Sequence, residues 1–158
     1  EIAQCLVGSE MCIRDRSQID ALRQLTHELL YLGMGGEPIY ADRFRQLNSD
    51  VYNQAEALYQ KKARNDEEEA TLCVTLLKAY SATINDRGDK GEKVQILLDR
   101  GWEVLNKISD SLLKCQLLVV CYGETSDEEL EKEARAIMNG WGDSLTVEQL
   151  ELLNEFIP

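Results

Sequence analysis

Apolar residues recur at intervals of three and four along nearly the whole chain of 158 residues, and this spacing places them on one face of an α-helix. The first run begins after Ser17, a residue type that caps helix N-termini, and ends at Gly33. The buried face of this first helix is predicted at Ile19, Leu22, Leu25, Leu29 and Leu32. No stretch alternates apolar and polar residues over the length of a strand. The chain is therefore predicted to be all-α.

A glycine-rich turn follows the first helix. Gly33, Gly35 and Gly36 tolerate a positive φ, and Pro38 keeps Glu37 in an extended conformation. Beyond the turn, helical spacing resumes at Phe44, Leu47, Val51, Ala55 and Leu58. A second helix of about five turns is expected there.

Polar residues that cap helices mark the starts of the later helices. Three pairs have the spacing of a capping box: Asn65 with Glu68, Ser126 with Glu129, and Thr146 with Gln149. Asp89 is a candidate start for the fourth helix, and Ser109 or Asp110 for the fifth. The apolar face of the third helix is predicted at Leu72, Cys73, Leu76, Leu77, Tyr80 and Ile84, and that of the fourth at Val94, Leu97, Leu98, Trp102, Leu105 and Ile108. The apolar face of the sixth helix is predicted at Leu130, Ala134, Ile137, Met138 and Trp141, and that of the seventh at Leu150, Leu153 and Phe156.

The fifth helix is apolar on most of its circumference, with Leu112, Leu113, Leu117, Leu118, Val120 and Cys121. We expect it to run through the middle of the domain. Six or seven helices joined by short polar loops pack antiparallel to their neighbours, either as a globular bundle or as stacked helical hairpins. A repeat of about 34 residues, which stacked hairpins of the tetratricopeptide type require, is not found. A single irregular bundle is favoured.

The first 16 residues, EIAQCLVGSEMCIRDR, differ in character from the rest. They resemble the peptide that results when sequencing-adapter bases are carried into an assembled gene and translated, so they are excluded from the fold prediction. They lack the basic segment and the cleavage site of a signal peptide. A flexible authentic N-terminus is the alternative. We therefore predict a non-native or disordered leader over residues 1–16 and one helical domain over residues 17–158.

The chain is strongly acidic, with a formal net charge of −12. Residues 1–16 contribute three acids and two bases, so the charge without them is −11. Binding to nucleic acid or to an anionic membrane surface depends on lysine and arginine, and an acidic domain disfavours both. No apolar run approaches the roughly 20 residues of a membrane span. We expect a soluble cytoplasmic protein that binds neither DNA nor membranes directly.

Three of the five cysteines lie within the helical patterns: Cys73, Cys115 and Cys121. They lack the CxxC spacing of metal sites, so they are expected to be small buried hydrophobic residues in a reducing compartment. A disulfide between two of them is the less favoured alternative. Cys5 and Cys12 belong to the leader.

A zinc-protease helix would need a second histidine four residues after His27, where the chain has Tyr31. His27 is the one histidine of the chain, so this site cannot form. The glycine turn at 33–36 lacks the strand and the lysine of a phosphate-binding loop. The turn at 85–92 places Leu97 where a calcium loop needs its bidentate glutamate. No catalytic residue, metal or cofactor is therefore predicted, and we do not expect an enzyme.

Acidic clusters at 66–69 and 127–133 occupy the first turns of helices, where carboxylates interact favourably with the helix dipole. This role is favoured over general-acid chemistry. Such acidity also attracts basic partners at long range. Aromatic residues near helix ends are either binding anchors or buried packing residues, and the sequence does not separate the two: Tyr31, Tyr40, Tyr52, Tyr59, Tyr80, Trp102 and Tyr122.

Four segments resemble the UpxZ family, small regulators encoded among capsular polysaccharide loci: HELLYLGMGGEPIYADRFRQLNSDVYNQAEALY at 27–59, YSATINDRGDKGEKVQILLDRGWEVL at 80–105, SLLKCQLLVVCYGE at 111–124 and DEELEKEARAIMNGWGD at 127–143. The resemblance implies an antagonist of UpxY proteins, which are NusG-like factors that let RNA polymerase read through into a capsule operon. Each antagonist silences heterologous loci. The implied mechanism is stoichiometric binding that occludes a basic or polymerase-facing surface, without turnover.

Candidate partner-binding residues come from the segments whose sequence exceeds simple apolar periodicity: Tyr31, Gly35, Glu37, Tyr40, Asp42, Asp86, Asp89, Glu124, Asp127 and Glu128. Structural need for glycine stops, a Pro38 turn and an Asp89 cap explains the same sequences equally well. An acidic adaptor domain for another basic protein is an alternative function. A small-ligand-binding bundle is a weaker alternative, because the inward positions are almost all apolar. The oligomeric state stays open.

Overall fold

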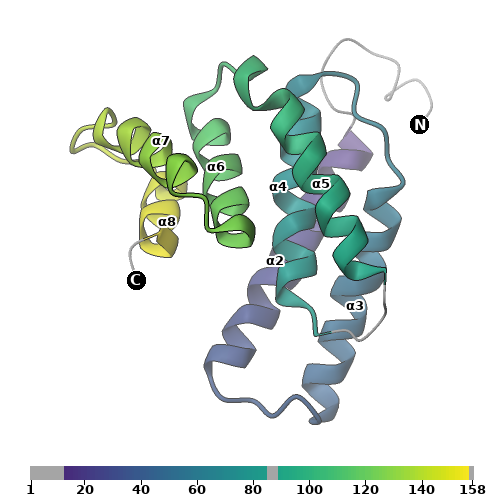
Figure 1. The fold of residues 1–158 in the computed structure, drawn as a ribbon. Helices are drawn as coiled ribbons and strands as arrows, with labels where there is room; N and C mark the ends of the chain where they lie inside the picture. The colour runs from purple at the N-terminus through teal and green to yellow at the C-terminus, as the bar shows by residue number, and fades with distance from the viewer. Residues whose placement is uncertain (1–12, 85–88, 157–158) are drawn as a thin grey trace.

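The structure is a computed structural model that describes residues 13–84 and 89–156 (Figure 1). Within these ranges the chain forms seven α-helices and one short 3-10 helix, and no strand. The helices are α2 (Ile13–Met34), α3 (Asp42–Tyr59), α4 (Asp66–Ala82), α5 (Lys90–Val104), η1 (Leu105–Lys107), α6 (Ser111–Thr125), α7 (Glu128–Asn139) and α8 (Val147–Phe156). The prediction of an all-α bundle of six or seven helices is confirmed.

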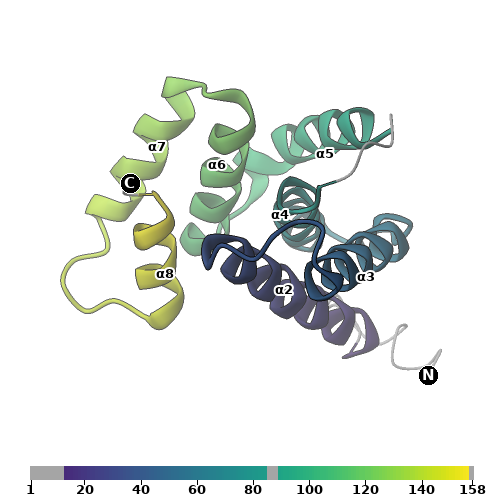
Figure 2. The same ribbon diagram turned by 90° about the horizontal axis from the view of Figure 1, so that it is seen from below.

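Helices α2 to α5 lie side by side and alternate in direction, as Figure 1 shows. Viewed from below, α4 occupies the middle, with α2, α3, α5 and α6 around it (Figure 2). Helix α7 packs against α6, and α8 contacts α6 more lightly. An ion pair of 3.1 Å between Lys78 and Glu155 also joins α8 to α4. The bundle is therefore organised around one central helix.

That central helix is α4, so the expectation that the fifth helix (α6) runs through the middle was wrong. Helix α4 is buried on almost its whole circumference from Ala70 to Tyr80. Its small residues Ala70, Cys73 and Ala79 let the backbones of neighbouring helices approach closely. On α6, Val119 and Val120 are only half-buried. Apolar residues around a whole helix indicate burial, but they do not identify which of two such helices has more neighbours.

Several predicted helix starts are confirmed by their hydrogen bonds. Asn65 accepts from the Glu68 amide at 2.9 Å and Asp110 from the Leu113 amide at 3.0 Å. The pair Thr146 and Gln149 makes both bonds of a capping box, at 2.9 and 3.2 Å. Side-chain oxygens thus satisfy amides that the helix leaves without partners.

Two predicted helix starts were wrong. Helix α2 already includes Ile13, so Ser17 is an interior residue rather than an N-cap, because no helix-breaking residue separates the two positions. Ser126 is the C-cap of α6, and the N-cap of α7 is Asp127, which accepts from the Glu129 amide at 3.0 Å. The predicted leader boundary at residue 16 thus lies inside α2, and residues 1–12 lie outside the described part of the chain.

Most predicted core positions are buried, and three are exposed. Ile84 follows the end of α4, where its amide donates to the Asn48 side chain at 2.8 Å. Trp102 lies about 100° around α5 from the buried Gly101. Leu150 is exposed because α8 turns Leu152 and Phe156 to the core. Each of these three residues lies at or beyond the edge of its apolar stripe.

Cys73, Cys115 and Cys121 are buried free thiols, as expected. Burial raises the pKa of Cys73 to about 12 and the pKa of Cys115 and Cys121 to about 11. These thiols therefore belong to the core packing. Within the described ranges, no helix has the length and apolar character to cross a membrane.

Candidate functional site

The turn that joins α2 to α3 projects from one end of the bundle (Figure 1). We call residues 30–42 the α2–α3 tip. The turn is closed by main-chain hydrogen bonds from the Glu37 amide to Leu32 at 3.2 Å and from the Gly36 amide to Gly33 at 3.1 Å. Gly36 has a φ of 82°, a conformation that favours glycine at helix ends. The tip is thus a defined turn. The stop predicted at Gly33 is one residue early, since α2 includes Gly33 and ends at Met34, and of the three glycines in the turn Gly36 is the one with a positive φ.

Large apolar side chains are concentrated on the tip. Five of the ten exposed large hydrophobic residues in the described ranges lie on it: Leu30, Tyr31, Met34, Ile39 and Tyr40. Met34 is 86% exposed, Tyr40 78% and Tyr31 73%. An isolated apolar residue on a surface needs no explanation, but several within thirteen residues make the tip a candidate interaction site.

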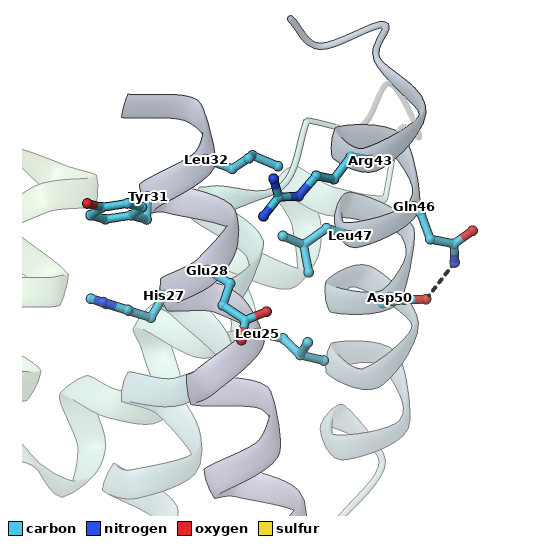
Figure 3. A pocket seen from close by; sticks show the side chains of 9 residues that line it. All are labelled: Leu25, His27, Glu28, Tyr31, Leu32, Arg43, Gln46, Leu47 and Asp50. Atoms are coloured by element: carbon cyan, nitrogen blue, oxygen red, sulfur yellow. Dashed lines mark hydrogen bonds between the residues drawn. The ribbon is translucent and has the colours of Figure 1, made fainter. Parts of the chain in front are cut away.

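A groove of about 650 Å³ lies between α2 and α3 beside the tip. Figure 3 shows its apolar floor, where Leu25 and Leu32 of α2 face Leu47 of α3. All three leucines are half-buried, so the floor is accessible to a partner. His27 and Tyr31 lie together on the opposite side of α2 in this view. The apolar floor of the groove therefore reaches the tip at Leu32.

Charged residues border the groove. Glu28 projects from α2 toward α3, and the guanidinium group of Arg43 points back toward α2 (Figure 3). Asp50 accepts a hydrogen bond of 2.9 Å from the Gln46 side chain. The border has two negative charges, on Glu28 and Asp50, and one positive charge, on Arg43, so its net charge is slightly negative. Such a groove suits a segment with apolar anchors and a basic residue beside them.

The structure brings five of the predicted partner-binding residues together. Tyr31, Gly35, Glu37, Tyr40 and Asp42 all belong to the tip or to the first residue of α3. The two tyrosines are the most exposed aromatic residues of this group, and Glu37 is half-buried. Their common location makes the tip the strongest candidate for a binding surface.

The other predicted residues lie elsewhere. Asp89 precedes α5 and pairs with Lys93 at 3.4 Å, and Asp86 lies outside the described residues. Glu124, Asp127 and Glu128 lie around the turn from α6 to α7. Asp127 serves as the cap of α7, which gives this residue a structural role. Together these residues do not form a continuous site with the tip.

Sequence reasoning missed three apolar residues of the tip and the leucine floor of the groove. Leu30, Met34 and Ile39 fall off the predicted buried stripes, and the apolar type at off-stripe positions beside a turn was the available signal. Among the aromatic candidates, Tyr31, Tyr40 and Trp102 are exposed. Those that pack in or against the core are Tyr52, Tyr59, Tyr80 and Tyr122.

The described residues include no group of three or more histidine, cysteine, aspartate or glutamate side chains placed to hold a metal ion. Glu68 is the one acid among their buried side chains, and it accepts from the Arg64 guanidinium at 2.8 Å and from the Arg64 amide at 2.7 Å. These two bonds hold the Glu68 carboxylate against Arg64 at the start of α4. The exposed features of the site are suited to binding a protein surface.

Comparison with known families matches residues 19–123 to the UpxZ family of transcription anti-terminator antagonists. A similar solved structure is the crystal structure of a transcription anti-terminator antagonist UpxZ from Bacteroides uniformis. It is 40% identical to this chain, with a TM-score of 0.78 over 89% of this chain and 88% of the other. No curated protein matches. The family is a regulatory family rather than an enzyme family, and its match covers most of α2, all of α3 to α5 and most of α6. On this agreement of sequence and fold, the chain belongs to the UpxZ family of transcription anti-terminator antagonists.

Proposed function

We propose that this chain binds and inhibits a NusG-like anti-terminator factor of the UpxY type. By doing so it represses heterologous capsular polysaccharide operons. Membership in a family of transcription anti-terminator antagonists supports the kind of partner. Because such a factor acts on RNA polymerase, the inhibitor acts in the cytoplasm.

The exposed apolar tip is the observation that carries this proposal. Tyr31, Met34 and Tyr40 are each more than two-thirds exposed, and Tyr31 is also one of the residues that line the groove. Tyrosines are frequent binding hot spots because they bury a large area at a low cost in side-chain entropy. We therefore assign the partner contact to the tip and the groove, with Glu37 and Asp42 at the edge.

The mode of action is stoichiometric occlusion. The chain has a formal net charge of −12, which favours approach to a basic surface and disfavours direct binding to nucleic acid. A basic surface on an anti-terminator factor is the kind of surface that would contact RNA polymerase or nucleic acid. By covering it, the bound inhibitor prevents read-through without any chemical step.

The test is a calorimetric titration of the full chain against purified NusG-like anti-terminator factors from capsule loci, at low and at high salt. We expect saturable one-to-one binding to some factors and weaker binding at high salt, because salt screens the attraction between opposite charges. A read-through transcription assay with the same factors should show inhibition at equimolar amounts.

The proposal is wrong if no factor binds while circular dichroism shows a folded helical chain in the same sample. Binding to an unrelated basic protein, in place of every factor tested, would favour the adaptor function instead. Binding that is equally strong at both salt concentrations would retain the partner but contradict the electrostatic part of the mechanism.

A further inference from the structure

The charged residues of α5 are divided between two sides of the helix. Its three bases turn toward other elements: Lys90 donates to the carbonyl of Thr83, Lys93 pairs with Glu56, and Arg100 pairs with Glu69 at 2.6 Å. Each base of α5 therefore has a partner within the bundle.

The acids of α5 that face solvent form no ion pair with the bases of this helix, and Glu103 also borders a hollow that Lys61, Lys62 and Lys107 line. Glu92, Asp99 and Glu103 are exposed, and Asp99 accepts a hydrogen bond of 3.1 Å from Gln95. Ile96 and Trp102 are also exposed, at 40% and 60%. We call these five residues, Glu92, Ile96, Asp99, Trp102 and Glu103, the α5 ridge.

Helical spacing places Asp99 between the two apolar residues of the ridge. Ile96, Asp99 and Trp102 follow one another at intervals of three, and Glu103 lies four residues after Asp99. Residues at these intervals are neighbours on a helix surface. An indole ring with carboxylates beside it attracts a guanidinium group in two ways, through the face of the ring and through ion pairing.

We propose that the α5 ridge is a second docking surface, which takes an arginine-bearing basic segment of a protein. The arginine stacks on Trp102 and pairs with Asp99 or Glu103, and an apolar residue of the same segment covers Ile96. Arginine is favoured over lysine because its planar group stacks on an aromatic ring and pairs with a carboxylate at the same time.

The ridge is separate from the site already described. Arg100 pairs with Glu69 in the first turn of α4, so the Trp102 end of the ridge lies near the start of α4. The α2–α3 tip lies at the other end of the bundle (Figure 1). The two surfaces therefore lie apart on the molecule, and the proposal goes beyond inhibition of an anti-terminator factor.

Tryptophan fluorescence gives a direct test, since the chain has two tryptophans. The buried Trp141 Nε1 atom has no hydrogen-bond partner among the described residues, so Trp141→Phe isolates the Trp102 signal without removing a hydrogen bond. The probe is an octapeptide of alternating arginine and alanine at low salt. We expect a saturable change in Trp102 emission, and weaker binding of the matching lysine peptide.

A matched pair of charge variants tests the position of the surface. Asp99→Asn with Glu103→Gln should weaken peptide binding about fivefold. Glu148→Gln with Glu151→Gln removes the same charge from exposed acids of α8 and should change it by less than about twofold. Trp102→Ala, measured by calorimetry, should lose the preference for arginine.

Three results would overturn the proposal. The first is a peptide titration without any change in Trp102 emission. The second is equal loss of affinity in the α5 and α8 variants, which would indicate general acidity. The third is a dimer in analytical ultracentrifugation that Trp102→Ala disrupts, since the ridge would then be covered by a second copy of the chain.

Discussion

The hydroxyl of Tyr80, in the central helix α4, donates a hydrogen bond of 2.6 Å to the carboxylate of Glu56 in α3. Lys93 of α5 pairs with the other oxygen of the same carboxylate. Tyr80 is fully buried, and the rings of Tyr52 and Tyr59 pack edge-on against it at 6.1 and 6.4 Å. One carboxylate therefore ties together three helices of the bundle that supports the tip.

Tyr80→Phe should lower the free energy of unfolding by about 2 kcal/mol, because a hydrogen bond to a charged group is lost inside the bundle. Urea denaturation followed by circular dichroism measures this change. Tyr59→Phe is the matched control, since Tyr59 packs on the same ring and its hydroxyl makes no hydrogen bond within the described residues. A similar loss in both variants would contradict the role of the Glu56 bond.

The same network makes stability depend on pH. Burial alone would raise the pKa of Glu56, but the hydrogen bonds from Lys93 and Tyr80 outweigh it and lower the pKa below 4.5. A carboxyl with a lowered folded pKa stabilises the fold above its unfolded pKa, and this contribution is lost as the pH falls through the folded value. The free energy of unfolding should therefore decrease as the pH is lowered below 4.5. Glu56→Gln should lose stability at neutral pH and show a shallower acid dependence, and an unchanged slope would contradict the assignment.

Gly101→Ala should destabilise the protein by about 1 kcal/mol. A Cβ at this position of α5 would lie 3.0 Å from Leu117 Cδ1 of α6 and 3.8 Å from Cys73 Cβ of α4. The steric cost of this overpacking, about 1–3 kcal/mol, exceeds the gain in helix propensity when alanine replaces glycine. Gly123→Ala is the control, because a Cβ there meets nothing within 4 Å, and it should stabilise by up to about 1 kcal/mol. Thermal melts of the two variants should shift in opposite directions.

The turn between α6 and α7 offers a second pair of opposite effects. Asp127→Ala removes the cap of α7 and should cost about 1 kcal/mol. Ser126 has a φ of 58°, a left-handed conformation that favours glycine, so Ser126→Gly should leave stability unchanged or raise it by up to about 1 kcal/mol. Chemical denaturation distinguishes the two. If Ser126→Gly loses stability and Asp127→Ala does not, Ser126 rather than Asp127 is the N-cap of α7.

Local features of the fold were predictable from the sequence. The caps at Asn65, Asp110 and Thr146 depend on side chains within three residues of the bond that they make. Buried stripes such as Leu22, Leu29 and their neighbours depend only on helical period. The caps are complete within one helix, and the face that a helix buries follows from its own spacing, so neither prediction requires the arrangement of the other helices.

Features that depend on other helices were not predictable. The choice of α4 over α6 as the central helix follows from how many neighbours surround each one. The cap at Asp127 rather than Ser126 depends on where α6 ends. Met34 and Ile39 are apolar residues off the predicted stripes, but whether another helix covers them is decided only by the fold, which leaves both exposed. Tyr31 and Tyr40 were named as candidate partner-binding residues from the sequence around the turn, and their role in binding stays a prediction.

Binding of a NusG-like anti-terminator factor to the double variant Tyr31→Ala and Tyr40→Ala tests the central claim most directly. Both side chains are mostly exposed, so the variant should fold with nearly unchanged stability. As two hot-spot tyrosines, they should together contribute at least about 2 kcal/mol to binding, which weakens the calorimetric affinity about thirtyfold or more. The control, Val147→Ala with Leu150→Ala, removes two exposed apolar residues of α8 and should bind like the unmodified chain. If instead the tyrosine variant binds the factor as tightly as the unmodified chain, the tip is not the inhibitory surface.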